Sequence, residues 1–228
     1  MAIAFFDFDR TLIAANSAVL WLRSEVRQGN VSRLKALLAS AWVARYNLGF
    51  SSGRGDGLRI GIAFLAGRLE AELRDRSVAF YDQFVRGLYR PGARVVLEEH
   101  RAGGDTLALL TSTTSYIGEL VADELQLDAV LCNRFEVDDA GVYTGRPLGE
   151  LCYGPGKVSH ARAFARSRGV SLDQCAFYTD SFSDLPLMLE VGRPVAVNPD
   201  ARLRREALLR GWETVDWGSP VPEVAAAP

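Results

Sequence analysis

Residues 3–9, IAFFDFD, form an apolar run that ends in two carboxylates, Asp7 and Asp9. A short continuous apolar run is typical of a parallel strand that is covered on both faces. Residues two positions apart on a strand share one side, so both carboxylates should lie at its carboxyl end, where open α/β sheets hold their sites. Adjacent carboxylates repel each other unless a cation lies between them or one stays protonated. The pair therefore predicts a metal site, an acid/base role or both, and the alternative is a strand-end Asp that caps a helix.

Four segments, taken together and in this order, resemble the motifs of the haloacid dehalogenase (HAD) superfamily of phosphatases. The first, FFDFDRTL, matches D-x-D-x-T, and the fourth, YTDSFSDLPLM, has the D-x-x-x-D spacing; these two are specific. The second, LALLTST, and the third, GPGKVSHARAF, would be weak alone, because a strand-end hydroxyl or a surface lysine is common. The resemblance extends from about residue 3 to residue 200, and the motif residues are Asp7, Asp9, Thr11, Thr111, Lys157, Asp180 and Asp184.

The resemblance implies a role for each motif residue. Asp7 would be the nucleophile and a metal ligand, while Asp9 would be the general acid/base and would bind the metal through its backbone carbonyl. Thr111 would bind a phosphoryl oxygen, and Lys157 would neutralise charge on the nucleophile and the phosphate. Asp180 would be the second carboxylate ligand, supported by Asp184. Mg²⁺ is the expected cofactor, because a carboxylate attacks a dianionic phosphate ester only when positive charge reaches the phosphoryl oxygens.

Strand and helix patterns alternate along the chain, which predicts an α/β fold with a doubly wound parallel sheet. Residues 1–13 and 89–217 should form this Rossmann-like core, with a small helical cap, residues 14–88, inserted after the first strand and a flexible tail at 218–228. In the cap we expect helices at 17–28, 31–48 and 69–87, and the glycine-rich stretch 50–68 has no clear assignment. The remaining expected elements are helices at 92–102, 116–126, 157–168, 184–190 and 200–210, strands at 105–111, 129–132, 175–179 and 194–197, and a hairpin within 133–146.

The substrate is less well defined than the chemistry. Phosphoserine phosphatases carry a Glu nine residues after the nucleophile, whereas this chain has Asn16, and an amide cannot pair with an ammonium as a carboxylate does. Glu25 or Asp56 could take the place of that acid. The candidate substrate-binding residues are Asn16, Arg54, Arg59 and Ser112.

The expected helix at 31–48 carries only basic charges, with Trp42 and Tyr46. This pattern fits either a cap helix with a solvated basic edge or an interfacial helix that makes weak contact with a membrane surface.

Composition narrows the class of protein. The chain has 228 residues, is 48% hydrophobic and carries a formal charge of −2, which gives no sign of nucleic-acid binding. Cys132, Cys152 and Cys175 lack metal-ligand spacing, so we expect reduced, buried thiols and a cytoplasmic protein. The sequence shows neither a signal peptide nor an apolar stretch that could span a bilayer.

The sequence therefore predicts a Mg²⁺-dependent phosphomonoester hydrolase that uses a phospho-aspartyl intermediate on a small phosphorylated metabolite or lipid headgroup. The alternatives within the enzyme class are phosphoserine phosphatase and an aspartyl-phosphate phosphotransferase. The alternative outside that class is a phosphate- or lipid-binding module that has lost turnover. The oligomeric state is not indicated by the sequence.

Overall fold

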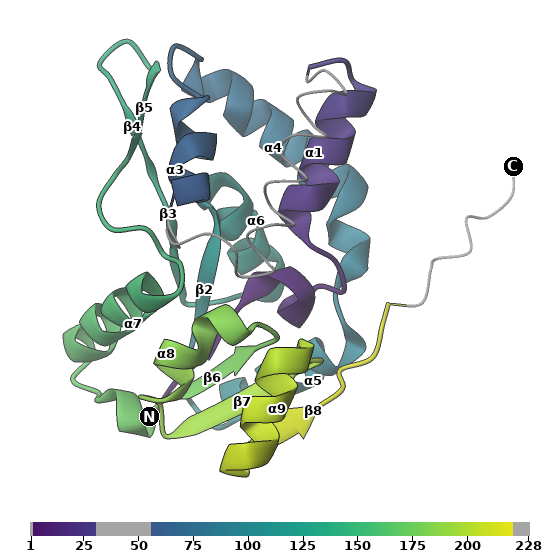
Figure 1. The fold of residues 1–228 in the computed structure, drawn as a ribbon, viewed down its shortest axis with the longest axis vertical. Helices are drawn as coiled ribbons and strands as arrows, with labels where there is room; N and C mark the ends of the chain where they lie inside the picture. The colour runs from purple at the N-terminus through teal and green to yellow at the C-terminus, as the bar shows by residue number, and fades with distance from the viewer. Residues whose placement is uncertain (1, 31–55, 221–228) are drawn as a thin grey trace, which may run out of the picture.

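The computed structural model describes residues 2–30 and 56–220, which are built around a sheet of six parallel strands (Figure 1). The strand order reverses between β1 and β6, which are hydrogen-bonded neighbours although more than half of the chain separates them. Open α/β sheets bind ligands at the carboxyl ends of the strands beside such a reversal. This architecture confirms the predicted doubly wound α/β fold. From one edge to the other the strands are β3 (Ala129–Asn133), β2 (Thr106–Thr114), β1 (Ile3–Phe6), β6 (Ala176–Thr179), β7 (Arg193–Val197) and β8 (Glu213–Val215).

Helices cover both faces of the sheet because the central strands are apolar on both sides. Phe6 belongs to the hydrophobic cluster that α5 and α6 cover, and Phe5 belongs to the cluster under α7, α8 and α9. Each of these fully buried phenylalanines contributes roughly 1.5–3 kcal/mol. The covering helices are α5 (Pro91–Ala102), α6 (Ser115–Leu125), α7 (Pro155–Ser167), α8 (Leu185–Met188) and α9 (Ala201–Arg210).

The segment after β1 leaves the sheet and returns to it at one place. Ala14 N–H donates to the Leu88 carbonyl oxygen at 2.9 Å, and Arg90 N–H donates to the Leu12 carbonyl oxygen at 2.9 Å. Helices α1, α3 and α4 therefore lie between two adjacent connections, and Figure 1 shows them in the upper half of the molecule. The described elements of this segment are α1 (Ser17–Arg27), α3 (Asp56–Ala63), α4 (Glu70–Phe84) and the short 3₁₀ helix η2 (Arg86–Leu88).

The predicted hairpin is present and packs against the segment between the two connections. It consists of β4 (Phe135–Val137) and β5 (Tyr143–Pro147), which pair antiparallel. Tyr143 N–H donates to the Arg68 carbonyl oxygen and Gly67 N–H donates back to the Tyr143 carbonyl oxygen, at 2.9 and 3.0 Å. The hairpin thus extends its pairing onto the α3–α4 connection.

Most predicted elements are confirmed to within a few residues, and four differ. The helix predicted at 184–190 is wrong in extent, because Phe182–Asp184 form a 3₁₀ turn and only Leu185–Met188 are α-helical. Strand β2 continues three residues beyond the predicted end, through polar residues. Helix α3 occupies part of the unassigned glycine-rich stretch, and β8 was not predicted because it is short and mostly exposed. The predicted helix at 31–48 lies outside the described residues.

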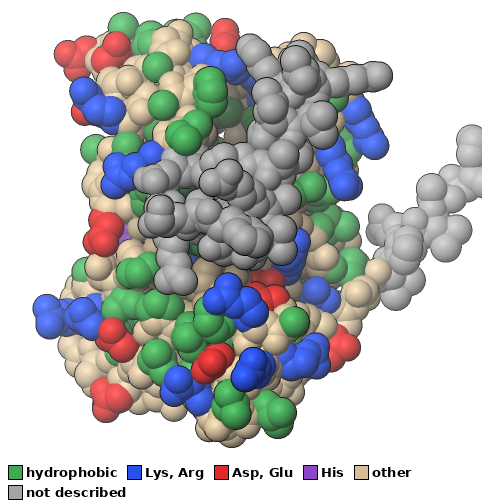
Figure 2. Space-filling view, in the orientation of Figure 1, with side chains coloured by type: hydrophobic (Ala, Val, Ile, Leu, Met, Phe, Trp, Pro, Cys, Tyr) green, Lys and Arg blue, Asp and Glu red, His purple; other side chains and the backbone are tan. Residues whose placement is uncertain are grey.

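The surface and the thiols agree with the composition. On the face shown in Figure 2, basic and acidic side chains of the described residues are intermingled. Cys132, Cys152 and Cys175 are buried and free, as predicted. No helix within residues 2–30 and 56–220 is long and apolar enough to cross a membrane.

Candidate active site

The two specific motifs meet at the reversal of strand order. Asp7 follows β1 and Asp180 follows β6, and Asp7 N–H donates to the Tyr178 carbonyl oxygen at 2.9 Å. Each Asp is only 6% exposed. The sheet itself therefore brings together two carboxylates that are far apart in the sequence.

A five-residue turn, η1 (Phe8–Leu12), connects the first motif to the fourth. The turn brings the fully buried Thr11 under the loop of the fourth motif, where its Oγ1 accepts a hydrogen bond from Asp180 N–H at 3.0 Å. A buried amide without a partner costs about 1–3 kcal/mol, so this hydroxyl stabilises the position of Asp180. The Thr of D-x-D-x-T thus acts on Asp180 through the backbone.

Lys157 joins Asp7 to the fourth motif. Its Nζ, on the first turn of α7, donates to Asp7 Oδ1 and to Asp184 Oδ2, each at 2.8 Å. Burial disfavours the ammonium, but Asp184 and Asp7 outweigh it and raise the pKa of Lys157 above its ordinary value. Thr179 Oγ1 donates a further hydrogen bond to Asp184 Oδ2 at 2.7 Å. The ammonium bridge therefore orients the Asp7 carboxyl group through one of its two oxygens.

Asp9 faces the beginning of α1. The Ser17 N–H donates to Asp9 Oδ1 at 2.6 Å, and burial raises the pKa of Asp9 above its ordinary value. Asp9 thus differs from Asp7, because its partner is a backbone amide instead of an ammonium. A carboxyl whose protonated form is favoured suits a general acid.

Thr111 lies at the carboxyl end of β2, the neighbour of β1 on the other side. It is 1% exposed, and its Oγ1 accepts from Thr113 N–H at 3.2 Å. The next residue, Ser112, is partly buried, and its carbonyl oxygen accepts from Asn133 Nδ2 at 2.6 Å. Asn133 Oδ1 in turn accepts from Cys152 N–H at 2.8 Å, so this side chain ties the end of β2 to the loop before α7.

The site contains more buried carboxyl groups than buried positive charges, and a bound hard cation would offset this excess. Burial, opposed by Lys157, raises the pKa of Asp7 from 3.8 to about 7. Burial, together with the Asp7 and Asp184 charges, raises the pKa of Asp180 from 3.8 to about 8. Among the described residues no donor forms a hydrogen bond to the Asp180 carboxylate. Both groups are costly to ionise unless a cation joins them.

The few protein oxygens at the site suit Mg²⁺ better than a cation that requires protein side chains for all of its ligands. Within the described ranges no three His, Cys, Asp or Glu residues form a group that could hold a metal ion. Mg²⁺ keeps waters and substrate oxygens among its ligands, and one or two carboxylates are enough. Asp7 and Asp180, with the Asp9 carbonyl oxygen, are the residues that fit this requirement.

The predicted substrate-binding residues are not all brought to the site. Asn16 Oδ1 accepts from Val19 N–H at 3.0 Å and so caps α1, while Arg59 is exposed on α3. Glu25 is buried in an ion pair with Arg76, which leaves it unsuited to bind a substrate amine. Arg54 lies outside the described residues.

Sequence reasoning missed three residues that hold the site together. Thr179 binds Asp184, Asn133 binds the end of β2, and the buried Arg90 donates through Nε to the Arg10 carbonyl oxygen at 3.1 Å. Thr179 had a signal, because it is a polar residue at the end of an apolar strand. No pattern in the sequence pointed to Asn133 or Arg90.

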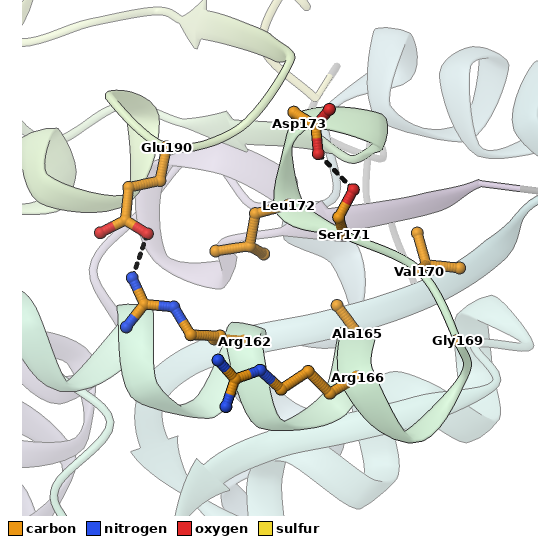
Figure 3. A pocket seen from close by; sticks show the side chains of 9 residues that line it. All are labelled: Arg162, Ala165, Arg166, Gly169, Val170, Ser171, Leu172, Asp173 and Glu190. Carbon is orange, nitrogen blue, oxygen red and sulfur yellow. Dashed lines mark hydrogen bonds and ion pairs between the residues drawn. The ribbon is translucent and has the colours of Figure 1, made fainter.

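A surface pocket elsewhere on the molecule has no part in this site. It has a volume of about 540 Å³ and lies between α7 and the turn η3 (Leu172–Gln174) (Figure 3). None of the motif residues lines it. Arg162 pairs with Glu190 and Ser171 bonds Asp173, so polar groups of its lining already have partners.

Comparisons with known proteins agree with the geometry. A model of the haloacid dehalogenase-like hydrolase family matches residues 4–189. Phosphoserine phosphatase SerB1 of Mycobacterium tuberculosis (strain ATCC 25618 / H37Rv) is 35% identical over 219 residues, covering 95% of this chain and 71% of that protein. The histidinol-phosphatase of Neisseria meningitidis serogroup C (strain 8013) is 29% identical over 221 residues, covering 94% and 98%.

Solved structures share the fold. A Bordetella pertussis Tohama I protein of unknown function has a TM-score of 0.85 and 30% identity, with 95% of this chain and 99% of that chain covered. A phospho-aspartyl intermediate analogue of phosphoserine phosphatase has a TM-score of 0.70 and 17% identity, with 98% and 96% covered.

Proposed function

We propose that this phosphatase, which belongs to the haloacid dehalogenase-like hydrolase family, hydrolyses small phosphomonoesters through phosphorylation of Asp7, with Mg²⁺ as its cofactor. The observation that carries the proposal is the Lys157 bridge between Asp7 Oδ1 and Asp184 Oδ2. The bridge engages one oxygen of Asp7, and among the described residues no donor forms a hydrogen bond to Oδ2. That oxygen is available to attack phosphorus.

The reaction has two balanced steps. In the first, Asp7 Oδ2 forms a bond to phosphorus while the bond to the ester oxygen breaks, and Asp9 gives its proton to the leaving alcohol. In the second, Asp9 takes a proton from water as the water oxygen forms a bond to phosphorus and the bond between Asp7 Oδ2 and phosphorus breaks, which releases inorganic phosphate and restores the Asp7 carboxylate. Thr111 and Lys157 bind phosphoryl oxygens in both steps. Mg²⁺, when bound by Asp7, Asp180 and the Asp9 carbonyl, supplies positive charge to those oxygens.

We further propose that residues 14–88 form a cap over the core formed by residues 1–13 and 89–217. The adjacent connections at 12–14 and 88–90 support these boundaries, because both strands of the linkage are hydrogen-bonded to each other. A cap that closes over the site excludes water and strengthens each electrostatic contact inside.

The proposed substrates are phosphorylated metabolites or lipid headgroups of low molecular weight. Phosphoserine is a specific second candidate because a 35% identical relative is named phosphoserine phosphatase, and histidinol phosphate is a third because of the 29% identical relative. The helix-capping role of Asn16 and the ion pair of Glu25 count against phosphoserine, since neither offers a free carboxylate to an ammonium. Membrane contact through residues 31–48 stays a prediction, and so does a cytoplasmic location.

Phosphate release from a panel of esters tests the proposal. The panel contains phosphoserine, histidinol phosphate, phosphoethanolamine and p-nitrophenyl phosphate, each assayed with Mg²⁺ or with EDTA. We expect release that requires Mg²⁺ and falls by more than about 10³-fold in Asp7→Asn, which lacks the nucleophile. Activity of Asp7→Asn close to the wild type would reject the mechanism.

The same assay separates the alternatives. A phosphotransferase would transfer the phosphoryl group to added alcohols, which lowers the yield of free phosphate per ester consumed. A binding module would bind inorganic phosphate or an ester, as measured by calorimetry, but would hydrolyse none of the esters.

A further inference from the structure

Arg10, between the acid Asp9 and Thr11, has a backbone conformation that its side chain disfavours. Its φ is 59° and its ψ is −5°, in the left-handed region. This conformation is sterically unfavourable for a residue that carries a Cβ atom, whereas glycine adopts it freely. A residue that is held in such a conformation at a functional site suggests that the side chain has a use.

Two hydrogen bonds hold the Arg10 backbone in place. Arg10 N–H donates to the Ala15 carbonyl oxygen at 2.9 Å, and Arg90 Nε donates to the Arg10 carbonyl oxygen at 3.1 Å. Arg90 is itself buried and lies immediately before the first residue of α5. The direction in which the Arg10 side chain leaves the backbone is therefore fixed from both sides.

The Arg10 guanidinium is exposed and close to the carboxylates of the site. Arg10 lies in the turn between Asp9 and Thr11, and the Thr11 hydroxyl accepts a hydrogen bond from Asp180 N–H at 3.0 Å. Among the described residues it makes no hydrogen bond and no ion pair through its side chain. A positive charge that has no side-chain partner within residues 2–30 and 56–220 thus lies beside the site.

We propose that Arg10 is a specificity-determining residue whose guanidinium binds an anionic group, carboxylate or phosphate, on the leaving-group half of the substrate. Arg10 follows Asp9, the residue that would protonate the leaving oxygen, while Asp7, Lys157 and Thr111, which would contact the phosphoryl group, are buried. Guanidinium groups bind carboxylate and phosphate through two parallel hydrogen bonds, which gives both affinity and orientation. This inference rests on the proposed function.

The test compares esters that differ only in the charge of the leaving group. Ethyl phosphate has an uncharged leaving group, phosphoglycolate adds a carboxylate, and ethane-1,2-diol bisphosphate adds a phosphate. In this chain, Arg10→Gly should lower kcat/KM for the anionic esters, relative to ethyl phosphate, by about 10- to 100-fold, as expected for a charge-assisted hydrogen bond. Arg10→Lys should fall between Arg10→Gly and the wild type. The ester that loses more identifies whether the site prefers carboxylate or phosphate.

Controls separate binding from folding and from overall charge. Arg205→Ala removes an exposed arginine on α9, outside the site, and should leave the ratio of anionic to uncharged esters as it is. The melting temperature of Arg10→Gly should equal or exceed that of the wild type, because glycine relieves the backbone cost.

Two results would overturn the inference. An equal fall of kcat/KM for charged and uncharged esters in Arg10→Gly would mean that Arg10 acts on the transferred phosphoryl group, and an unchanged kcat/KM for every ester would mean that it binds no part of the substrate. Both results require a wild-type enzyme that releases phosphate. If the wild type hydrolyses none of these esters and none of the panel above, the proposed function fails, and the role of Arg10 fails with it.

Discussion

Replacement of Lys157 by Met tests the charge arrangement at the centre of the site. Met keeps the apolar stem but removes an ammonium that is 2.8 Å from both Asp7 and Asp184. Loss of one partner from a buried ion pair costs about 3–5 kcal/mol, because the remaining charge is left without compensation. For a chain of this size, that loss lowers the melting temperature by on the order of 10 °C. Phosphate release should fall by about 10²- to 10³-fold, since a donor to the phosphoryl oxygens is gone.

A double-mutant cycle identifies the cause of that loss. Urea unfolding is measured for Lys157→Met, Asp184→Asn and the double variant, all in EDTA. The double variant should be at least about 1 kcal/mol more stable than Lys157→Met, because the amide introduced at position 184 carries no charge that needs a partner. Its activity should stay as low as that of Lys157→Met. Strictly additive losses, or a loss below about 1 kcal/mol for Lys157→Met, would refute the view that the ammonium compensates two buried carboxylates.

Three other predictions address the acid, the metal and the turn. Asp9→Asn should slow hydrolysis of ethyl phosphate more than that of p-nitrophenyl phosphate, whose leaving group needs no proton, and equal losses would exclude Asp9 as the acid. In EDTA, the raised pKa values of Asp7, about 7, and Asp180, about 8, mean that the folded chain holds protons that the unfolded chain releases above pH 3.8. Stability should therefore fall from about pH 4 to pH 8, and Mg²⁺ should raise the melting temperature more at pH 8 than at pH 5; an equal rise at both pH values would contradict this. Thr11→Val should cost about 1–3 kcal/mol in urea unfolding by leaving the buried Asp180 amide unpaired, while Thr11→Ser should cost much less.

The elements that sequence reasoning predicted correctly are those with a strong apolar pattern. Strands β1 and β6 are buried on both faces, so nearly every residue must be apolar and the run is visible in the sequence. Strand β8 is short and mostly exposed, which leaves no such pattern. The turn of residues 8–12 depends on contacts with distant segments, in particular the hydrogen bond that Thr11 Oγ1 accepts from Asp180 N–H, and no local sequence pattern predicts it.

Motif side chains of the candidate site that bind one another were predicted from the sequence, whereas two side chains that bind the backbone were not. Asp7, Lys157 and Asp184 were predicted from their motifs, and the structure joins all three through hydrogen bonds of 2.8 Å. Asn133 and Arg90 were not predicted, because each binds backbone carbonyl oxygens, which every residue type possesses. A side chain that binds a backbone group has a partner that every residue possesses, so the sequence does not show where that partner lies.

The same reasoning explains why the partner of Asp9 could not be predicted. The motif indicated an acid, but the group that orients it is the Ser17 amide, at the first residue of α1. Any residue other than proline at position 17 supplies this donor, so the residue type carries no information. What matters is the number of residues between Asp9 and α1, together with the cap that Asn16 forms, because both fix where the amide lies. The segment that begins with α1 therefore contributes to the geometry around Asp9 through chain length, a property that residue types do not reveal.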